Sequence, residues 1–530
     1  MGELWFGGKI YTMEKPNEQV EAVLTQDGII LAAGKEEEIR DAYSSTIATE
    51  HNLKGNVLYP GFVDSHLHII GHGEKLMRLD LSQMTSVSEM KQALKNYASN
   101  LPEGEWLIGE GWNENLWDDP EVPHKHELDA ISTKHPIMLT RVCRHALLAN
   151  SHAIELAGVT EQSVDPQGGK IVRDDHDYMT GYFLDTAQEL IKEAMPEFKQ
   201  GYLERAIRLS VQDLWKNGIV GGHTEDMNYY GGFFKTHQAY LNTINGDQLK
   251  FRVHLLVHHG VVDEMIDLGH SYKTGTEFVE FGAMKIFADG AIGGRTAWLS
   301  EDYTDDKGNQ GMPIHEDENL IQLVKRARQY NLPIAVHTIG DQAVEAVLEA
   351  IQEHPPTSPD LRDRIIHAQF LREDLIEELQ KVNAIIDIQP TFVSSDFPWV
   401  IERIGEERLP YAYAWKTLLD KGIPCAGGSD APIEEINPLM GIRAAVLRKA
   451  DSDGKVYGED QQLSMFEAVS LYTTGSAYAI GEEDKRGKVE AGYLADFTVL
   501  DKDLFAITPE EIASANVVQT VVSGDIVYKN

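Results

Sequence analysis

The chain has 530 residues, of which 42% are hydrophobic and 25% are charged, a composition typical of a globular protein with a large core. Its formal net charge of −38 argues against nucleic acid or an anionic membrane as a partner, because both need a basic surface. No uninterrupted apolar stretch is long enough to span a bilayer, so no membrane segment is expected.

The cysteine content and the start of the chain indicate a cytoplasmic location. Cys143 and Cys425 are the only cysteines, so the sequence contains no disulfide framework and no CxxC metal motif. Residues 1–6 lack a basic segment followed by a long apolar one, and no signal peptide is expected.

Both ends of the chain favour β-strands. Asp27-Gly28 separates two apolar runs and is a strong hairpin signal. The apolar runs are 20–25 and 29–33 near the start, and 495–500, 517–522 and 526–528 near the end. Isolated hairpins are only marginally stable, so we predict that the two ends pair as one small sheet domain. Two unrelated tails are the alternative.

The middle of the chain alternates short apolar runs with amphipathic helical stretches such as 322–329 and 343–353. The eight candidate strands are 63–68, 218–222, 251–258, 282–287, 333–337, 364–367, 384–389 and 424–428. This order predicts an α/β fold, a (β/α)8 TIM-type barrel.

The first two of these strands are separated by about 150 residues, far more than a βα unit needs. The segment has structural signals of its own. Ser86-Val87-Ser88-Glu89 resembles a capping box, and Met90, Leu94 and Tyr97 follow it at helical spacing. We therefore expect an inserted subdomain over about 72–210, lying over the mouth of the barrel where a substrate would enter.

The histidines of His66-Leu67-His68 are the first candidate metal ligands. On a β-strand, side chains at i and i+2 point to the same face, so His66 and His68 could bind one metal ion together. A chance pair among the 20 histidines of the chain is the alternative.

Other metal-type residues lie where later strands end, which is where barrel enzymes place their active sites. These are His337, His367 and Asp430, while Lys285 interrupts an otherwise apolar strand. Each has a structural alternative: a hydrogen-bonded histidine, an N-capping aspartate or a lysine that reaches toward solvent. Their occurrence at the ends of several strands favours a shared metal centre.

These segments resemble the amidohydrolase superfamily, within it the YtcJ-like group of amidohydrolase family 3 that includes N-substituted formamide deformylases. The resemblance covers nearly the whole chain. It rests on five stretches: Pro60–His68, Met284–Ala297, Val336–Asp341, Ile366–Gln369 and Gly428–Asp430. It implies a β-sandwich built from residues 1–58 and 485–530, beside a metal-dependent hydrolase barrel at 59–484.

The resemblance also implies the metal ligands. His66 and His68 would bind one ion, and His337 and His367 a second. Lys285, carboxylated by CO₂ to N6-carboxylysine, would bridge the two. Zinc suits imidazole and carboxylate ligands, with one or two ions per chain. Asp430 would contact the first ion and act as general base and then general acid.

The implied activity is hydrolysis of a non-peptide C–N bond in a small molecule, a linear amide or N-substituted formamide. Trp112, His145, Asp289 and Arg295 are candidate substrate contacts. Two alternatives remain open: a lactone or ester hydrolase on the same centre, and a non-catalytic regulatory protein that retains the fold. Members of the family often form homodimers, so the resemblance also implies a homodimer.

Overall fold

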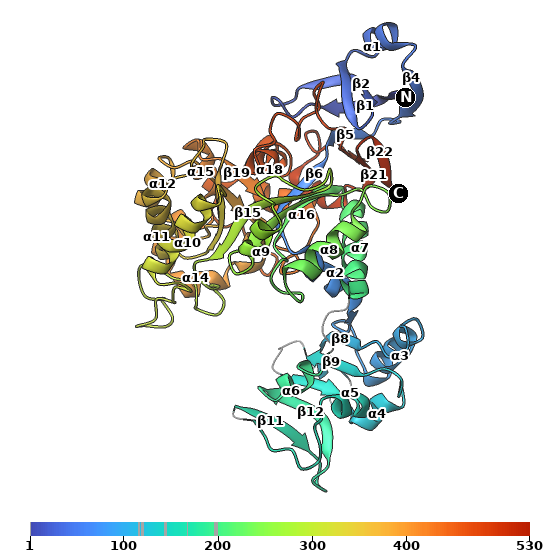
Figure 1. Ribbon diagram of the computed structural model, residues 1–530, viewed down its shortest axis with the longest axis vertical. Coiled ribbons are helices and arrows are strands. Elements are labelled where there is room, and N and C mark those ends of the chain that lie inside the picture. The colour runs from blue at the N-terminus through green and yellow to red at the C-terminus, as the bar shows by residue number, and fades with distance from the viewer. Residues whose placement is uncertain (1, 115–116, 118–120, 142–145, 167, 196–199) are drawn as a thin grey trace. The chain divides into compact units, whose positions relative to one another are not determined.

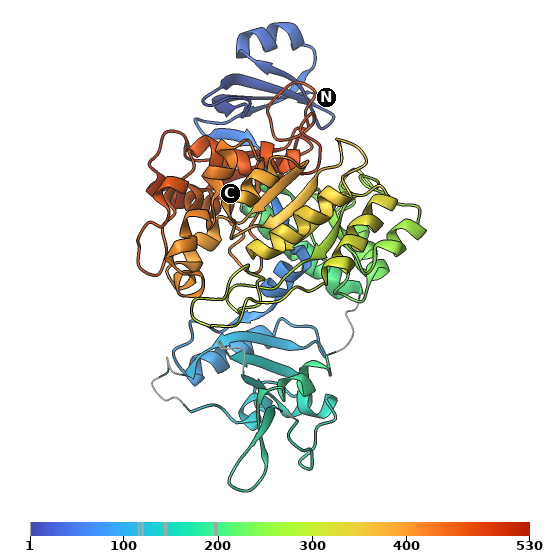
Figure 2. The same cartoon turned by 90° about the vertical axis from the view of Figure 1, so that its left-hand side faces the viewer.

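The computed structural model describes residues 2–114, 117, 121–141, 146–166, 168–195 and 200–530 (Figures 1 and 2). The chain forms two compact units. The first contains Met1–His72 and Leu203–Asn530, and the second contains Gly73–Tyr202.

The centre of the first unit is a sheet of eight parallel strands. In chain order these are β6 (Phe62–Leu67), β13 (Ile219–Thr224), β14 (Arg252–His258), β15 (Val279–Phe287), β16 (Ile334–Thr338), β17 (Asp363–His367), β18 (Ala384–Ile388) and β19 (Cys425–Gly427). Each strand pairs with the next, and their interior is buried, as parallel sheets require.

Two backbone hydrogen bonds link the first strand to the segment after the last one. The amide of Asp430 donates to the carbonyl of His66 over 2.8 Å, and the amide of His68 donates to the carbonyl of Ala431 over 2.8 Å. The sheet is therefore a nearly closed barrel, and the predicted α/β barrel is confirmed at this level.

Helices follow the barrel strands. The two predicted stretches lie in α10 and α11, whose apolar positions, such as Leu320, Val324 and Ala327 of α10, are buried. Two helices contain residues of both units, namely α2 (Ile69–Met77) and α7 (Gln200–Lys216). The other helices among and after the barrel strands are α8 (Phe233–Thr243), α9 (Val262–Asp267), α10 (Asp317–Gln329), α11 (Asp341–Glu353), α12 (Glu373–Leu379), α13 (Thr391–Asp396), α14 (Trp399–Ile404), α15 (Trp415–Asp420), α16 (Pro438–Leu447), α17 (Met465–Leu471) and α18 (Thr474–Ala479). Short 3₁₀ helices are η2 (Glu406–Tyr411), η3 (Glu459–Gln461) and η4 (Pro509–Ser514).

Strands from both chain ends pair in one second sheet. The strands are β1 (Gly2–Tyr11), β2 (Gln19–Gln26), β3 (Ile29–Gly34), β4 (Ile47–Asn52), β5 (Val57–Pro60), β20 (Phe497–Leu500), β21 (Val517–Val522) and β22 (Asp525–Lys529), with α1 (Glu36–Tyr43) after β3. The two ends meet where β20 runs antiparallel to β5, with Thr498 opposite Tyr59. Asp27 and Gly28 join β2 to β3 with positive φ angles of 51° and 79°, as a tight hairpin turn requires. The division of the first unit into a sandwich and a barrel domain stays a prediction.

The second unit has its own six-stranded sheet, in the order β11-β12-β10-β9-β8-β7. Its elements are β7 (Leu79–Asp80), α3 (Val87–Ala98), β8 (Leu107–Trp112), α4 (Lys125–Asp129), β9 (Ile137–Arg141), β10 (Ala146–Ala149), α5 (Ser151–Leu156), β11 (Gly169–Arg173), β12 (Met179–Asp185) and α6 (Gln188–Lys192). Ser86 caps α3 by accepting a hydrogen bond from the amide of Glu89, while the carboxylate of Glu89 binds Thr85 and not Ser86. Half of the predicted capping box is therefore present.

Across the described part of the chain, none of the helices is both long and apolar enough to cross a membrane.

Candidate metal centre

The barrel brings the predicted metal-type residues to one end. His66 lies in β6 and His68 directly after it, Lys285 in β15, His337 in β16, and His367 at the end of β17. Asp430 follows β19 by three positions. Parallel strands have all their carboxyl ends on the same side, so these six side chains converge where barrel enzymes carry their active sites.

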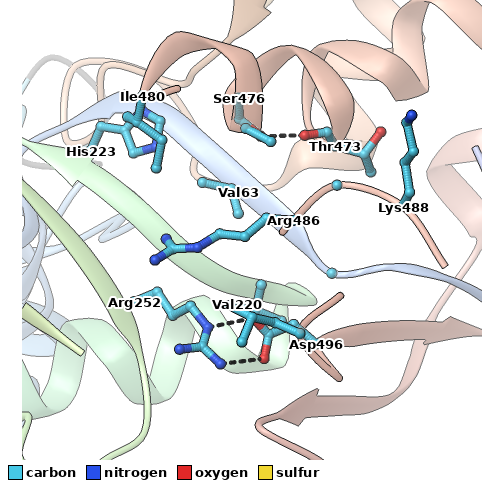
Figure 3. Close-up of a pocket in the computed structure, with 14 residues that line it drawn as sticks. Val63, Val220, His223, Arg252, Thr473, Ser476, Ile480, Arg486, Lys488 and Asp496 are labelled. Atoms are coloured by element: carbon cyan, nitrogen blue, oxygen red, sulfur yellow. Dashed lines mark hydrogen bonds and ion pairs between the residues drawn. The ribbon is translucent and has the colours of Figure 1, made fainter. Parts of the chain in front are cut away.

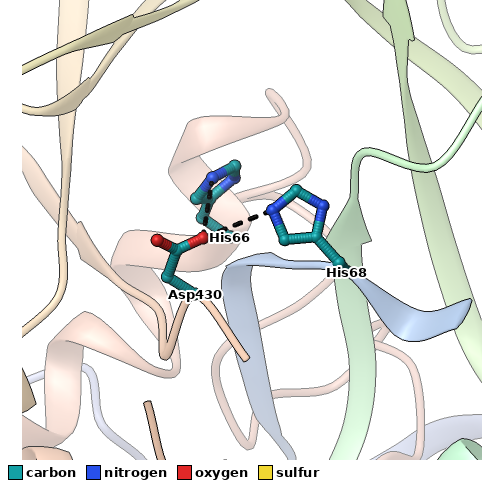
Figure 4. Close-up of side chains that lie close together, drawn as sticks. All are labelled: His66, His68 and Asp430. Carbon is teal, nitrogen blue, oxygen red and sulfur yellow. Dashed lines mark ion pairs between the residues drawn. The ribbon is translucent and has the colours of Figure 1, made fainter. Parts of the chain in front are cut away.

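Three of them form a cluster of possible ligand atoms (Figure 4). Nε2 of His66 lies 3.5 Å from Oδ1 of Asp430, and Nε2 of His68 lies 3.4 Å from the same oxygen. All the ligand atoms of this group are within 4.8 Å of one another. Two imidazoles and a carboxylate are a donor set that suits zinc and other divalent first-row metals.

The electrostatics of this cluster fit a cation. Burial by itself lowers the pKa of His68, but the hydrogen bond to Asp430 and the nearby carboxylates of Glu225 and Asp226 raise it to about 9. Burial would raise the pKa of Asp430, yet His68, His367 and Lys285 together lower it. The negative charge of Asp430 therefore attracts a proton to His68, and a metal ion would satisfy the same attraction.

The backbone at two of these positions is unusual. Asp430 has a φ of 58° and His367 a φ of 75°, values in the left-handed region that side chains other than glycine rarely adopt. Such conformations concentrate at functional sites, where the surrounding structure holds them. Gly428 permits the approach of this turn to β6, because a Cβ at that position would lie 2.6 Å from the amide nitrogen of His66.

Asp64 holds the same turn in place. Its carboxylate accepts hydrogen bonds from the amides of His66, over 3.0 Å, and Ser429, over 3.1 Å. Burial raises the pKa of Asp64 to about 7, although these hydrogen bonds oppose the rise. One side chain thus fixes the exits of both β6 and β19.

His337 and His367 form a second pair beside the first cluster. Nε2 of His367 lies 3.1 Å from Nδ1 of His337, and the rings of His66 and His367 are 5.5 Å apart between centroids. Burial lowers the pKa of His367 to about 4 and that of His337 well below its ordinary value. Both rings are therefore neutral at neutral pH, the form in which imidazole binds a metal.

Lys285 is fully buried, and among the described residues no hydrogen-bond partner reaches its Nζ. Its ammonium faces the ring of Phe287 at 4.8 Å. Burial lowers its pKa to about 8, against the opposing charges of Glu225 and Asp430. A buried amine with no partner is unusual enough to require an explanation.

Two of the candidate substrate contacts have other interactions in the first unit. Asp289 is buried, and its carboxylate accepts three backbone hydrogen bonds, from Trp298, Ile339 and Gly340, over 2.8 to 2.9 Å. Arg295 lies on an exposed loop and pairs with Asp305, with Nη2 2.8 Å from Oδ2. Asp289 therefore ties the loop after β15 to the turn after β16.

The other two candidates belong to the second unit. Trp112 has no exposed surface, stacks on Trp117 at 5.8 Å between centroids, and donates its indole N–H to the carbonyl of Leu139. These contacts give Trp112 a packing role in the core of this unit. His145 lies outside the described residues.

The structure adds two residues to the centre that sequence reasoning did not assign. Glu225, directly after β13, is fully buried, with Oε2 3.9 Å from Nδ1 of His68. Extending the predicted second strand, 218–222, by three residues would have placed Glu225 at its carboxyl end. Gln389, after β18, has Oε1 2.6 Å from Nδ1 of His367. Its direction depends on how the barrel closes, and no pattern in the sequence reveals it.

A narrow cavity elsewhere in the first unit lies among the starts of several barrel strands (Figure 3). Val63, Val220 and Arg252 line it, and Arg252 is held by Asp496 of the end segment, with Nη2 3.0 Å from Oδ1. Residues of α18 and of the segment before β20 complete its lining. Because its strand residues lie mainly near the amino ends of β6, β13 and β14, this cavity is separate from the candidate centre.

The fold and the site together define the class of this protein: a parallel barrel that carries a candidate divalent-metal site, made of histidines and an aspartate, at the carboxyl ends of its strands. A profile of the amidohydrolase family matches residues 49–528. The chain therefore belongs to the amidohydrolase family.

The relatives of this chain agree with that assignment. It is 48% identical over its full length, and over the full length of the relative, to the Bacillus subtilis (strain 168) protein named "Putative amidohydrolase YtcJ". It is 25% identical to the N-substituted formamide deformylase of Arthrobacter pascens, covering 98% of this chain and 97% of that one. A crystal structure of an uncharacterized metal-dependent hydrolase from Pyrococcus horikoshii OT3 matches with a TM-score of 0.80 and 28% identity, over 96% of this chain and 99% of that one.

Proposed function

We propose that this protein is a metal-dependent amidohydrolase that cleaves a non-peptide C–N bond in a small molecule, either a linear amide or an N-substituted formamide. The observation that carries the proposal is the cluster of His66, His68 and Asp430 at the carboxyl end of the barrel in a chain of this family. The name of the Arthrobacter relative supports the choice of bond.

The donor atoms fit a divalent metal, with zinc the ion best suited to imidazole and carboxylate ligands. His66, His68 and Asp430 would hold one ion, and His337 and His367 a second. A bound ion would supply water of low pKa, near ~7, and a polarised substrate carbonyl.

Asp430 moves the proton in this proposal. Its Oδ1 faces both histidine nitrogens, and Figure 4 shows its other oxygen turned away from the two rings. Because neighbouring charges lower its pKa, Asp430 is a carboxylate at neutral pH and can accept a proton from the attacking water. Asp430 then returns this proton to the leaving nitrogen, so that an amine and a carboxylic acid are released.

Lys285 is proposed to carry a carboxyl group. Its neutral amine would attack the carbon of CO₂, one C=O bond would open to C–O⁻, and one N–H proton would pass to water, which leaves an anionic carbamate. Burial favours this reaction because it lowers the pKa of the amine to about 8 and so increases the neutral fraction. The carbamate would also give the unpartnered Nζ a chemical role.

The remaining assignments are extensions of the same proposal. The β-rich segments 1–58 and 485–530 form a sandwich domain beside the barrel, and the insert covers about 72–210. Asp289 positions loops near the substrate, and His145 and Arg295 stay candidate substrate contacts. Trp112, which has no exposed surface, is assigned a packing role instead. The protein is proposed to be cytoplasmic and to form a homodimer.

Elemental analysis followed by a hydrolysis panel tests the function. Purified protein is expected to contain one or two divalent ions per chain, and metal-free protein is expected to regain turnover when that ion is restored. The panel compares linear amides, N-substituted formamides, cyclic ureides and lactones. Turnover of esters or lactones alone would replace the C–N assignment with ester hydrolysis, and a metal-free protein with full activity would contradict the proposal.

A further inference from the structure

His337 and His367 each turn one ring nitrogen toward the other, and this contact is unusual because neither of the two nitrogens carries a hydrogen that it could donate. Nδ1 of His337 and Nε2 of His367 are 3.1 Å apart. Which of the two could donate depends on where each ring carries its hydrogen, and the opposite nitrogen of each ring decides that.

Both opposite nitrogens face oxygens that can only accept. Nε2 of His337 lies 3.1 Å from the carbonyl oxygen of Gly290, so this nitrogen carries the hydrogen. Nδ1 of His367 lies 2.6 Å from Oε1 of Gln389. With the oxygen of the Gln389 amide on this side, Nδ1 must carry the hydrogen of the His367 ring.

The orientation of the Gln389 amide is fixed by a further contact. Its Nε2 donates to the carbonyl of Asp387 over 3.1 Å, within the same buried segment. A flipped amide would place two oxygens against each other, so Oε1 must face His367. The two facing nitrogens therefore both present lone pairs.

Two lone pairs at this distance repel unless a cation lies between them. Two imidazole nitrogens on one tetrahedral zinc ion are roughly 3.3 Å apart, given bonds of about 2.0–2.1 Å. The observed separation is close to that value. The pair is therefore already arranged as two ligands of one ion.

We infer that Gln389 is a positioning residue of the second metal site: it accepts the Nδ1 hydrogen of His367 and so fixes the tautomer whose Nε2 binds the ion. The inference rests on the proposed function and deepens it, because it assigns a residue outside the ligand set. Hydrogen-bond partners of metal-binding histidines contribute 10- to 100-fold to affinity in general.

Metal affinity of the demetallated full-length chain is the test, with Co²⁺ and Zn²⁺ as probes against a competing chelator. Gln389→Leu removes the acceptor and should weaken one of two sites by about 10- to 100-fold, with the other site unchanged. Gln389→Glu keeps an acceptor for the Nδ1 hydrogen, and its second oxygen, protonated at this buried position, can still donate to the carbonyl of Asp387. This variant should restore affinity to within about threefold of the wild type. Gln389→Met has about the length of glutamine but cannot accept this hydrogen, so it should stay as weak as Gln389→Leu; recovery in methionine as well as glutamate would show that only packing had been lost.

Gln461→Leu is the matched control, because Gln461 is a buried glutamine that both accepts from and donates to Thr417, away from the centre. It should bind both ions as the wild type does. Wild-type affinity in Gln389→Leu, or equal loss in the Leu and Glu variants, would overturn the inference while the proposed function stands. A wild-type chain that binds neither ion would overturn the proposed function itself.

Discussion

Three buried aspartates at the candidate centre differ in charge because their neighbours differ. Asp64 and Asp289 accept mainly backbone hydrogen bonds, and burial raises the pKa of each to about 7. Asp430 is also buried, but His68, His367 and Lys285 lower its pKa. The sequence alone could suggest Asp430 as the base, whereas its charge follows from contacts that only the fold supplies.

Replacing Asp430 by asparagine should remove the proton acceptor and preserve the shape of the site. Turnover is expected to fall by about 10²- to 10⁴-fold, the usual contribution of general acid–base catalysis. His66 and His68 remain, so metal content measured by elemental analysis should change little. Asp363→Asn is the control: Asp363 is buried, is bound by Arg328 and lies at the amino end of β17, opposite to the carboxyl ends that carry the centre, so this change should lower stability and preserve kcat. Wild-type turnover in Asp430→Asn would contradict the proton role.

Lys285→Ala tests whether the buried amine contributes to metal binding. If a carbamate on Lys285 contacts both ions, the variant should contain fewer ions per chain than the wild type, and added acetate or propionate should partly restore them by occupying the space. Metal content by elemental analysis, with and without the acid, is the measurement. An unchanged ion content in the variant would show that Lys285 has no part in binding.

At the scale of secondary-structure elements, the centre depends on short turns that begin where the strands end. The turn after β19 contains Gly428, Ser429 and Asp430, and Asp64 on β6 holds it through the amide of Ser429. The same turn makes the hydrogen bonds that link the end of the last strand to the first strand. The contacts that close the barrel therefore also place Asp430 beside His66 and His68.

Gly428→Ala should disturb both together. The added Cβ would lie 2.6 Å from the amide nitrogen of His66 and 2.9 Å from Oδ1 of Asp64, and backbone cannot move away easily. Overpacking of this kind typically lowers the free energy of unfolding by about 1–3 kcal/mol. The free energy of unfolding measured in urea should fall, and the affinity for metal should weaken. Gly34→Ala, where a Cβ would meet nothing within 4 Å, should match the wild type in both, and equal behaviour of the two variants would refute the argument.

The barrel strands could be predicted because each is a short apolar run followed by a polar strand end. This pattern lies in neighbouring residues and can be recognised without knowing which strands pair. Gln389 and Glu225 could not be assigned in the same way. The direction of a side chain just beyond a strand depends on the register and closure of the whole barrel. The sheet of the second unit was missed for a related reason, since β12 pairs with β10 across more than thirty positions that carry no periodic signal.

At the scale of the molecule, the two units have separate hydrophobic cores. In the second unit, two buried clusters fill the two sides of the six-stranded sheet. One includes Leu94, Leu107 and Trp112, and the other includes Ile108, Leu147 and Phe183. All members of both clusters come from within Gly73–Tyr202. A segment that buries its own apolar side chains in this way has the property that defines a domain.

The fragment Gly73–Tyr202 should therefore fold by itself. We expect cooperative thermal and urea unfolding with a stability of about 5 kcal/mol or more, as for other domains of this size. The tryptophans of the fragment, Trp106, Trp112 and Trp117, give the probe: they pack in the two buried clusters, so the fragment should show blue-shifted fluorescence and a near-ultraviolet dichroism signal that disappear in the same transition. The shorter fragment 73–141 is the control. It lacks β10, which lies between β9 and β12, so half of the sheet and most of the second cluster are missing and no cooperative transition should occur. Non-cooperative unfolding of the longer fragment would show that its cores need the rest of the chain.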